Sequence, residues 1–345
     1  SGVGLFMTDL GGDLEQFKGS PILSGTFSNK GIKKLDRYML EQGLLTKYKF
    51  SIRPSSEPPE GTPKRDMYLI RVYEYPYEWE DFSEAQINER LMQIRLALRE
   101  MGEEDRSMMV FSFWPDVIMI KELGDPIQIA EYLGLNDSKL TAKVIMAQGR
   151  QNTNYAITLY ACHPFFLQGI STMTNGENTA FSPIRDYLSS RGFEGYGGYQ
   201  SDSESFTHIL HYTKNKLGLG LEAYKHIITP LKDEELEGHC ERDFLHTLKH
   251  TCRLLTIDGP NCVIGCLPDK TVFMTQDSKK LRPGVVGGKP GMFAFSSEMC
   301  GLDQAIPDSE RTYLFQPMKH DVAFVDAERT EVKKWNQWDT CIPQH

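Results

Sequence analysis

Four short polar segments hold the side chains of this chain that could do chemistry. They are Gly-Arg-Gln-Asn-Thr-Asn at 149–154, Cys-His-Pro-Phe at 162–165, Thr-Asn-Gly-Glu at 174–177 and Ser-Asp-Ser-Glu at 201–204. Each segment alone has an ordinary structural explanation. An Asn-Gly pair favours a tight turn, Ser-x-x-Glu favours a helix capping box, and an Arg after Gly is usually a solvated charge. The order and spacing of the segments, with the Ser-Gly-Val-Gly-Leu-Phe start of the chain, carry more information than any one of them.

In this order the segments resemble those of the class II glutamine amidotransferases, whose glutaminase domain is an N-terminal-nucleophile hydrolase. Mature chains of that family begin Cys-Gly-Ile/Val-Gly. They later carry Arg-x-x-Thr, a His-Pro or Gln-Pro-Phe step, His-Asn-Gly-Asp/Glu and Ser-Asp-x-Glu. Four of the five elements occur here in order, and the first differs because residue 1 is Ser. Thr174 stands where the family has His, and Asn-Lys-Gly at 29–31 is the nearest substitute for a His-Arg-Gly or Arg-Gly-x-Asp-Ser segment.

The resemblance implies a role for seven residues in hydrolysis of the L-glutamine side-chain amide. Ser1 would attack the amide, and its own α-amino group, with a reference pKa near 8, would serve as the base. The Asn175 side-chain amide and the Gly176 backbone N–H would stabilise the oxyanion. The implied substrate-binding residues are Arg150 for the α-carboxylate, Thr153 beside it, His163 in the pocket lining and Asp202 for the α-ammonium.

Several of these residues also have a structural explanation. A lone His before a proline, such as His163, is more often structural than functional. Asp202 can be a first-turn acid favoured by the helix dipole, which is compatible with substrate binding. Ser1 and Gly2 can be a remnant of cloning, although the glycine continues the family pattern.

Later motifs resemble the glutamate synthase type in particular. They are Asp-Gly-Pro at 258–260, Asp-x-x-x-Leu-Arg-Pro at 277–283 and Ser-Ser-Glu at 296–298. The chain carries no recognisable ammonia-acceptor domain, so a stand-alone subunit or an excised domain is expected. The implied partners are L-glutamine and a glutamate or N-methylglutamate synthase subunit that accepts ammonia, in a homo- or hetero-oligomer. No cofactor is expected in this chain, and FMN or an iron–sulfur cluster would belong to the partner.

Residue 1 leaves two further functions open. A thiolate is the better nucleophile at neutral pH, so a Ser1 chain can instead be a glutamine-binding or structural subunit that does not cleave. An N-terminal-nucleophile amidase acting on another amide would keep the chemistry of Ser1. Such an amidase would not require both Arg150 and Asp202, whose implied role is to bind the α-carboxylate and the α-ammonium of an amino acid.

The composition favours a large folded protein and disfavours several partners. The 345 residues are 40% hydrophobic, enough for one large core or two smaller ones. A net charge of −9 argues against broad binding to nucleic acid or anionic membranes. No apolar run approaches the roughly 20 residues of a membrane span. No signal peptide precedes Ser1, so a cytoplasmic protein is expected.

The seven cysteines indicate reduced thiols, because they are odd in number and scattered. Cys262 and Cys266 have three residues between them, but no second ligand pair lies nearby, so no metal site is expected.

Apolar periodicity predicts the elements that must position these side chains. Strands are predicted at 3–7, 67–75, 108–113, 117–120, 143–146, 262–266 and 272–274, and the resemblance implies a closing strand pair at 317–326. Helices are predicted at 32–45, 83–101, 126–133 and 244–255, with one more opened by a Ser-Pro cap at 182–183 and ending at Gly192. A loop is predicted at 9–31, another at 53–63, and a glycine-rich mobile loop at 195–198.

This arrangement predicts an α+β protein. The resemblance implies a four-layer αββα sandwich, in which two mostly antiparallel sheets lie between helical layers. One amidotransferase domain is expected over residues 1–345, with an inserted α+β segment at about 50–140. Glutamate synthases resemble this chain in carrying a long insertion at the same place.

Overall fold

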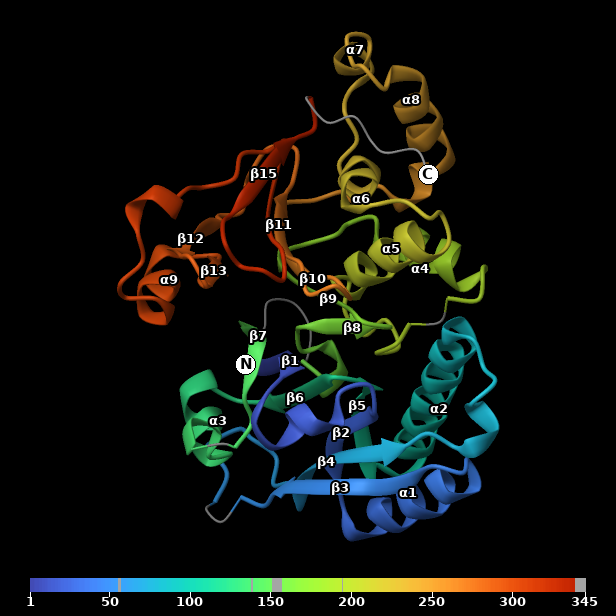
Figure 1. Ribbon diagram of the computed structural model, residues 1–345. Helices are drawn as coiled ribbons and strands as arrows, with labels where there is room; N and C mark the ends of the chain where they lie inside the picture. The colour runs from blue at the N-terminus through green and yellow to red at the C-terminus, as the bar shows by residue number, and fades with distance from the viewer. Residues whose placement is uncertain (55–56, 138, 151–156, 194, 339–345) are drawn as a thin grey trace. The chain divides into compact units, whose positions relative to one another are not determined.

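The computed structural model describes residues 1–54, 57–137, 139–150, 157–193 and 195–338. The chain divides into two compact units, Ser1–Gly169 and Ile170–His345 (Figure 1).

The first unit contains two antiparallel sheets. In the three-stranded sheet, β1 (Gly2–Leu10) lies between β6 (Val117–Leu123) and β7 (Ala142–Arg150). The four-stranded sheet has the order β3-β4-β2-β5, formed by β3 (Leu45–Ile52), β4 (Met67–Glu74), β2 (Pro21–Phe27) and β5 (Met108–Pro115). Helix α1 (Asn29–Glu41) connects β2 to β3, and α2 (Glu84–Asp105) connects β4 to β5. The four-stranded sheet is therefore a β-α-β-β-α-β motif.

Two apolar clusters hold the first unit together. One lies between the sheets and includes Met7, Ile22 and Ile120. The other joins the four-stranded sheet to α1 and α2, which lie on one side of that sheet in Figure 1. Three buried residues at helical spacing, Leu91, Ile94 and Leu98, place α2 in this second cluster, which confirms the predicted apolar face of that helix.

The prediction of a loop at 9–31 is wrong, because this segment contains the central strand β2. All seven residues of β2 are buried, so the strand shows no alternation of apolar and polar residues. A Cβ on Gly25 would lie 2.3 Å from the carbonyl oxygen of Met109, so this glycine allows the close approach of β5. The predicted helix at 32–45 is also displaced, since α1 begins at Asn29 and β3 begins at Leu45.

Shorter elements complete the first unit. Asp125 caps α3 (Pro126–Tyr132) by accepting two backbone N–H bonds, and this helix matches its prediction. The remaining elements are η1 (Gly12–Phe17), η2 (Tyr77–Trp79), η3 (Leu135–Asp137), η4 (Leu159–Ala161) and β8 (Phe165–Leu167).

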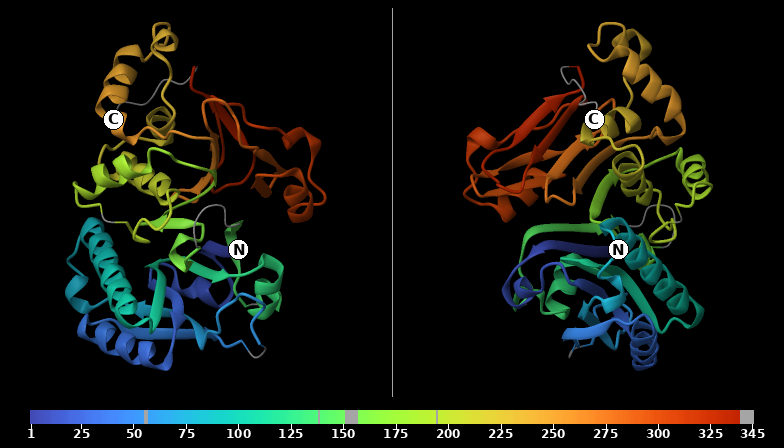
Figure 2. Two further views of the ribbon diagram at one scale, coloured as in Figure 1. Left: turned by 180° about the vertical axis from the view of Figure 1, so that it is seen from behind. Right: turned by 45° about the vertical axis from the view of Figure 1, so that its right-hand side comes forward.

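The second unit is built on a sheet in which its strands follow the order β15-β14-β11-β10-β9. These strands are β9 (Ile170–Gly176), β10 (Asn261–Cys266), β11 (Val272–Gln276), β14 (Asp321–Val325) and β15 (Lys333–Asn336). Helices α5 (Glu204–Asn215) and α6 (Leu221–Ile228) pack on one face of the sheet in a shared apolar core. Figure 2 shows this unit from two further sides.

The other elements of the second unit surround this sheet. The helical ones are α4 (Phe181–Ser189), α7 (Asp233–Leu236), α8 (Arg242–Thr251), η5 (Arg253–Leu255), α9 (Met299–Ala305) and η6 (Arg311–Tyr313). The strands β12 (Val285–Lys289) and β13 (Met292–Ser296) form a separate hairpin. The predicted helix at 244–255 is thus α8 followed by η5.

The strand pairs whose register is known are all antiparallel, and helices accompany the sheets, which confirms the α+β class. The four-layer sandwich stays a prediction. Among the described residues, none of the helices is both long enough and apolar enough to cross a bilayer. In the same residues, no three His, Cys, Asp or Glu side chains are grouped so that they could hold a metal ion.

Candidate active site

The first unit brings Ser1 and Arg150 together at one end of the three-stranded sheet. Ser1 is exposed and immediately precedes β1, and Arg150 is the last residue of β7. Arg150 lies directly opposite Gly2 in the antiparallel register of these strands. Its guanidinium Nη1 donates to the carbonyl oxygen of Ala161 at 2.6 Å. A candidate nucleophile and a candidate carboxylate-binding cation are therefore held on neighbouring strands.

Gly2 and Gly4 are needed because the segment at 162–164 lies directly against β1. A Cβ on Gly4 would lie 1.7 Å from the carbonyl oxygen of His163, and a Cβ on Gly2 would lie 2.6 Å from the Sγ of Cys162. No side chain fits at either position without displacing the segment. The Gly-x-Gly start of the chain therefore sets how closely His163 approaches the strand that carries Ser1.

His163 is buried with only 3% of its surface exposed. Burial, and then the positive charges of Arg150 and Lys121, hold the pKa of its imidazole well below the usual range. The ring is therefore neutral at neutral pH, and it packs against Phe165 with ring centroids 4.7 Å apart. This environment suits a neutral, packed ring and does not suit a charged one.

Lys121 is a buried cation that the sequence analysis did not single out. Its Nζ donates to the carbonyl oxygen of Cys162 at 2.5 Å and lies 5.0 Å from the centroid of the Phe165 ring. Lys121 lies opposite Gly4 in the register of β6 and β1. Lys121 thus holds the segment at 162–164 that packs on Gly2 and Gly4. No sequence pattern indicates this contact, because it depends on the pairing of β6 with β1. Thr153, predicted beside Arg150, lies outside the described residues.

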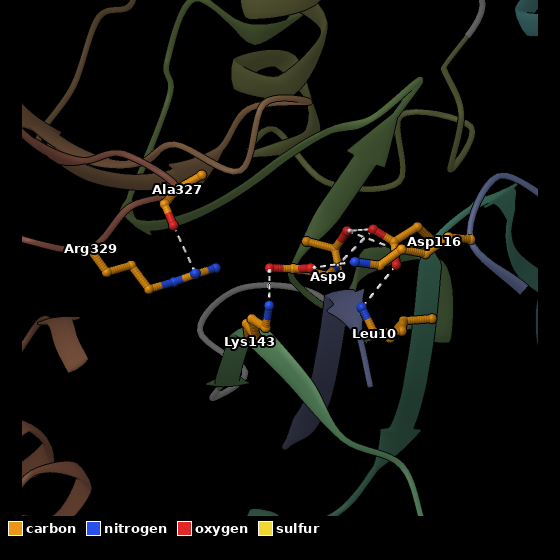
Figure 3. A network of polar contacts seen from close by, with 8 residues as sticks. Asp9, Leu10, Asp116, Lys143, Ala327 and Arg329 are labelled. Atoms are coloured by element: carbon orange, nitrogen blue, oxygen red, sulfur yellow. Dashed lines mark hydrogen bonds and ion pairs between the residues drawn. The ribbon is translucent and has the colours of Figure 1, made fainter. Parts of the chain in front are cut away.

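The opposite end of β1 is fixed by Asp116, the residue between β5 and β6. The Asp116 carboxylate accepts the backbone N–H groups of Leu10 at 2.8 Å and Asp9 at 3.1 Å, as Figure 3 shows. The hydroxyl of Thr8 donates to the Asp116 carbonyl at 2.7 Å. Lys143 Nζ lies 3.9 Å from the Asp9 carboxylate. These bonds hold the end of β1 that is remote from Ser1.

The second unit brings Asn175 and Gly176 together with Asp202. Asn175 and Gly176 end β9, so the Asn-Gly pair terminates a strand and is not the tight turn that such a pair favours. Gly176 has φ 156°, and a Cβ there would lie 2.0 Å from the carbonyl oxygen of Pro260. The Asp-Gly-Pro motif at 258–260 is therefore packed directly behind the candidate oxyanion pair.

Asn178 links that pair to Asp202. Its backbone N–H donates to the Asp202 carboxylate at 2.8 Å, and its side-chain amide donates to the Ser205 hydroxyl at 3.1 Å. Ser205 in turn donates to the carbonyl oxygen of Asp202 at 2.6 Å. Asn178 is buried. In the sequence, only its position two residues after Gly176 indicates that it could belong to the site.

The Ser-x-x-Glu capping box predicted as a structural alternative at 201–204 does not form. Helix α5 begins at Glu204 itself, and the buried Glu204 carboxylate accepts the backbone N–H groups of Gly197 at 2.5 Å and Tyr199 at 2.8 Å. His208 Nε2 lies 3.1 Å from the same carboxylate. Glu204 thus holds the glycine-rich loop that leads to Asp202.

The Ser-Pro cap predicted for the preceding helix is also wrong. Helix α4 begins at Phe181, and Ala180 is its N-cap without a side-chain bond. The side chain of Asn178 accepts the N–H of Ala180 at 3.1 Å instead. Helix α4 ends at Ser189, before the predicted end at Gly192; Gly192, with φ 81°, lies in the turn that follows, where Phe193 donates back to Leu188.

The predicted residues thus form two groups. The first unit holds Ser1, Arg150 and His163, and the second holds Asn175, Gly176 and Asp202.

Comparison with known proteins identifies one curated relative. No protein-family model matches the chain. Over 197 residues the chain is 27% identical to a protein of Methanothermobacter thermautotrophicus named "Putative glutamine amidotransferase". The match covers 56% of this chain and 54% of that protein, so the chain spans about half the length of the relative.

Two solved structures are also similar in part. A glutamine aminotransferase class-II domain protein from Silicibacter pomeroyi is 11% identical, with 97% of this chain and 99% of that chain covered and a TM-score of 0.34. A formyltetrahydrofolate deformylase from Pseudomonas putida KT2440 is 15% identical, with 35% and 29% covered and a TM-score of 0.16. Neither score establishes a shared fold.

Proposed function

We propose that the chain is a class II glutaminase that hydrolyses the side-chain amide of L-glutamine to glutamate and ammonia. The observation that carries this proposal is the pairing of β1 with β7, which sets Arg150 opposite Gly2, the residue that follows Ser1. The similarity to a protein named as a glutamine amidotransferase supports the same reaction.

In the proposed mechanism, the Oγ of Ser1 attacks the side-chain carbonyl carbon of glutamine. The α-amino group of Ser1 accepts the hydroxyl proton and passes it to the nitrogen that leaves as ammonia. Water then hydrolyses the glutamyl ester, which releases glutamate and restores Ser1. The Asn175 amide and the Gly176 N–H stabilise the oxyanion in both steps, and losing one such donor raises the barrier by about 3 to 4 kcal/mol.

The remaining residues bind the amino-acid end of the substrate in this proposal. Arg150 forms a bidentate ion pair with the α-carboxylate, and Asp202 binds the α-ammonium. Thr153 contacts the substrate beside Arg150. His163 lines the pocket as a neutral ring, in keeping with its lowered pKa.

The test is ammonia release from L-glutamine by the chain and by its Ser1→Cys and Ser1→Ala variants. We expect Ser1→Cys to be the most active form, because a thiol is the better nucleophile, and Ser1→Ala to be inactive. The proposal is wrong if ammonia release by the Ser1→Cys variant does not exceed that of Ser1→Ala.

Calorimetric binding of L-glutamine separates catalysis from recognition. Arg150→Met and Asp202→Asn should each weaken binding by about 2 kcal/mol or more, because each leaves one charged end of the substrate unpaired. Binding without release in every form would favour the second candidate, a non-catalytic glutamine-binding subunit, which the serine at position 1 motivates. Hydrolysis of amides without an α-amino acid end, with no loss in the two variants, would favour an amidase of different specificity.

We further propose that the ammonia passes to a synthase subunit of the glutamate or N-methylglutamate type. The motifs at 258–260, 277–283 and 296–298 support this type. FMN or an iron–sulfur cluster would then belong to that subunit. Co-purification with a flavoprotein from the native cell is the expected result, whereas full synthase activity of the isolated chain would contradict the proposal.

A further inference from the structure

The position of Ser1 depends on the bend that follows β6. The N–H of Gly124 donates to the carbonyl oxygen of Ser1 at 3.0 Å, and Leu123 lies opposite Gly2 in the register. Asp116 holds the remote end of β1, whereas this bend contacts the end that carries Ser1, in addition to the pairing of Gly2 with Arg150 of β7.

Side chains on two sides fix the bend itself. The hydroxyl of Thr62, a residue between β3 and β4, donates to the carbonyl oxygen of Leu123 at 2.7 Å. The carboxylate of Glu122 accepts the N–H of Leu123 at 2.8 Å. Gly124 has φ 143°, and a Cβ there would lie 2.6 Å from the hydroxyl oxygen of Thr62. Thr62 is therefore packed against the residue that bonds Ser1.

Glu122 is fixed in turn by residues on and just before β4. Its side chain is fully buried, and Arg65 binds it through two bonds, Nε at 3.0 Å and Nη2 at 3.1 Å. The hydroxyl of Tyr68 donates to the same carboxylate. Burial, followed by the negative charge of Glu122, raises the pKa of Tyr68, so this hydroxyl keeps its proton. A buried carboxylate with three such donors has one orientation.

We propose that Thr62, Arg65 and Tyr68 are positioning residues that hold residue 1 in its reactive geometry through Glu122 and the Leu123 to Gly124 bend. They belong to the segment between β3 and β4 and to β4 itself, so the β-α-β-β-α-β motif supports the catalytic end of β1. This inference rests on the proposed role of residue 1 as the nucleophile.

The test uses the full chain with Ser1→Cys as the parent. Thr62→Val removes one hydrogen bond at nearly constant shape, and Arg65→Met removes two bonds to Glu122. Thr62→Ser, which keeps the hydroxyl, is the rescue variant. Lys64→Ala is the matched control, because Lys64 lies in the same segment but pairs only with exposed Glu57 at 3.3 Å among the contacts described.

Two readouts are measured. Hydrogen exchange of the Gly124 amide should become about fivefold faster in Thr62→Val, the effect of losing a bond worth about 1 kcal/mol. The kcat for ammonia release should fall by about tenfold or more while the Kd for L-glutamine stays unchanged, because orientation of the nucleophile is lost and substrate binding is not. Thr62→Ser and Lys64→Ala should match the parent in both readouts.

Unchanged exchange at Gly124 in Thr62→Val, or faster exchange with an unchanged kcat, would overturn the inference. A loss of glutamine affinity in step with kcat would also overturn it, because the residues would then act on binding. If the parent releases no ammonia at all, the proposed hydrolysis fails. The positioning of residue 1 is then judged by exchange at Gly124 alone.

Discussion

At the scale of single residues, glycine decides how the candidate site is built. Gly2 and Gly4 let the segment at 162–164 pack against β1, and Gly176 lets the carbonyl of Pro260 approach the end of β9. In each case the atom that a Cβ would meet belongs to a segment distant in the sequence. The glycines are therefore requirements of tertiary contact and not of local turns.

Gly4→Ala should destabilise the first unit by about 3 kcal/mol or more, because the added methyl group meets a backbone oxygen that cannot rotate away. Chemical denaturation followed by tryptophan fluorescence measures the change. Gly238→Ala is the control, since a Cβ there has open space around it. Equal stability of the two variants would show that the segment at 162–164 does not lie against β1.

At the scale of elements, α5 organises the loop before it. Only 1% of the surface of Glu204 is exposed, and its carboxylate accepts hydrogen bonds from two backbone N–H groups of the loop at 195–199. Tyr199 has φ 51° and donates its hydroxyl to the carbonyl of Phe193 at 3.0 Å. The loop is thus closed on itself by the helix that follows, and it leads directly to Asp202.

Glu204→Gln should loosen this loop, because the amide NH2 of Gln cannot accept the second N–H bond. The expected cost is about 2 to 3 kcal/mol, the penalty for a buried donor without an acceptor. Hydrogen exchange of the Gly197 and Tyr199 amides is the measurement, with exposed Glu234→Gln as control. Full protection of both amides in Glu204→Gln would contradict the assignment.

At the scale of the whole molecule, buried neutral histidines make stability depend on pH. Burial lowers the pKa of His226 and of His211 to about 3 each, and neighbouring positive or titratable groups add to the shift. His226 lies in a polar cluster where Gln337 also contacts His239 and His320. In the unfolded chain these imidazoles have pKa values near 6.5.

The sign of the effect follows from proton binding. Below about pH 6.5 the unfolded chain takes up protons that the folded chain excludes, so stability is full above this pH and is lost as the pH falls towards 3. Each such histidine contributes a slope of about 1.4 kcal/mol per pH unit in this range.

In urea unfolding of the second unit, the free energy of unfolding should therefore fall between pH 7 and pH 4. His226→Asn should reduce the slope of this free energy against pH by the contribution of one histidine. His250→Asn, at an exposed position, should leave the slope unchanged. An unaltered slope in His226→Asn would mean that His226 is protonated in the folded protein.

Elements with a clear periodic pattern could be predicted from the sequence. The face of α2 follows from Ile87, Leu91, Ile94 and Leu98, because one side of that helix meets the sheet and the other meets water. Strand β2 could not be predicted in this way, because both of its faces are buried and it contains Gly25 and a proline at its start. Its pairing with β4 and β5 involves residues at least 40 positions away, the separation of Phe27 and Met67.

The candidate site also has one part that the sequence could predict and one part that it could not. The sequence by itself determined the candidate residues for binding and cleaving glutamine, which the resemblance implies, because side-chain chemistry and motif order are local properties of the chain. Tertiary structure alone decided that Arg150 lies opposite Gly2, that Asn178 ties Asp202 to the end of β9, and that Glu204 binds a loop instead of capping its helix. Those contacts depend on strand register and on close packing between distant segments, which no local pattern encodes.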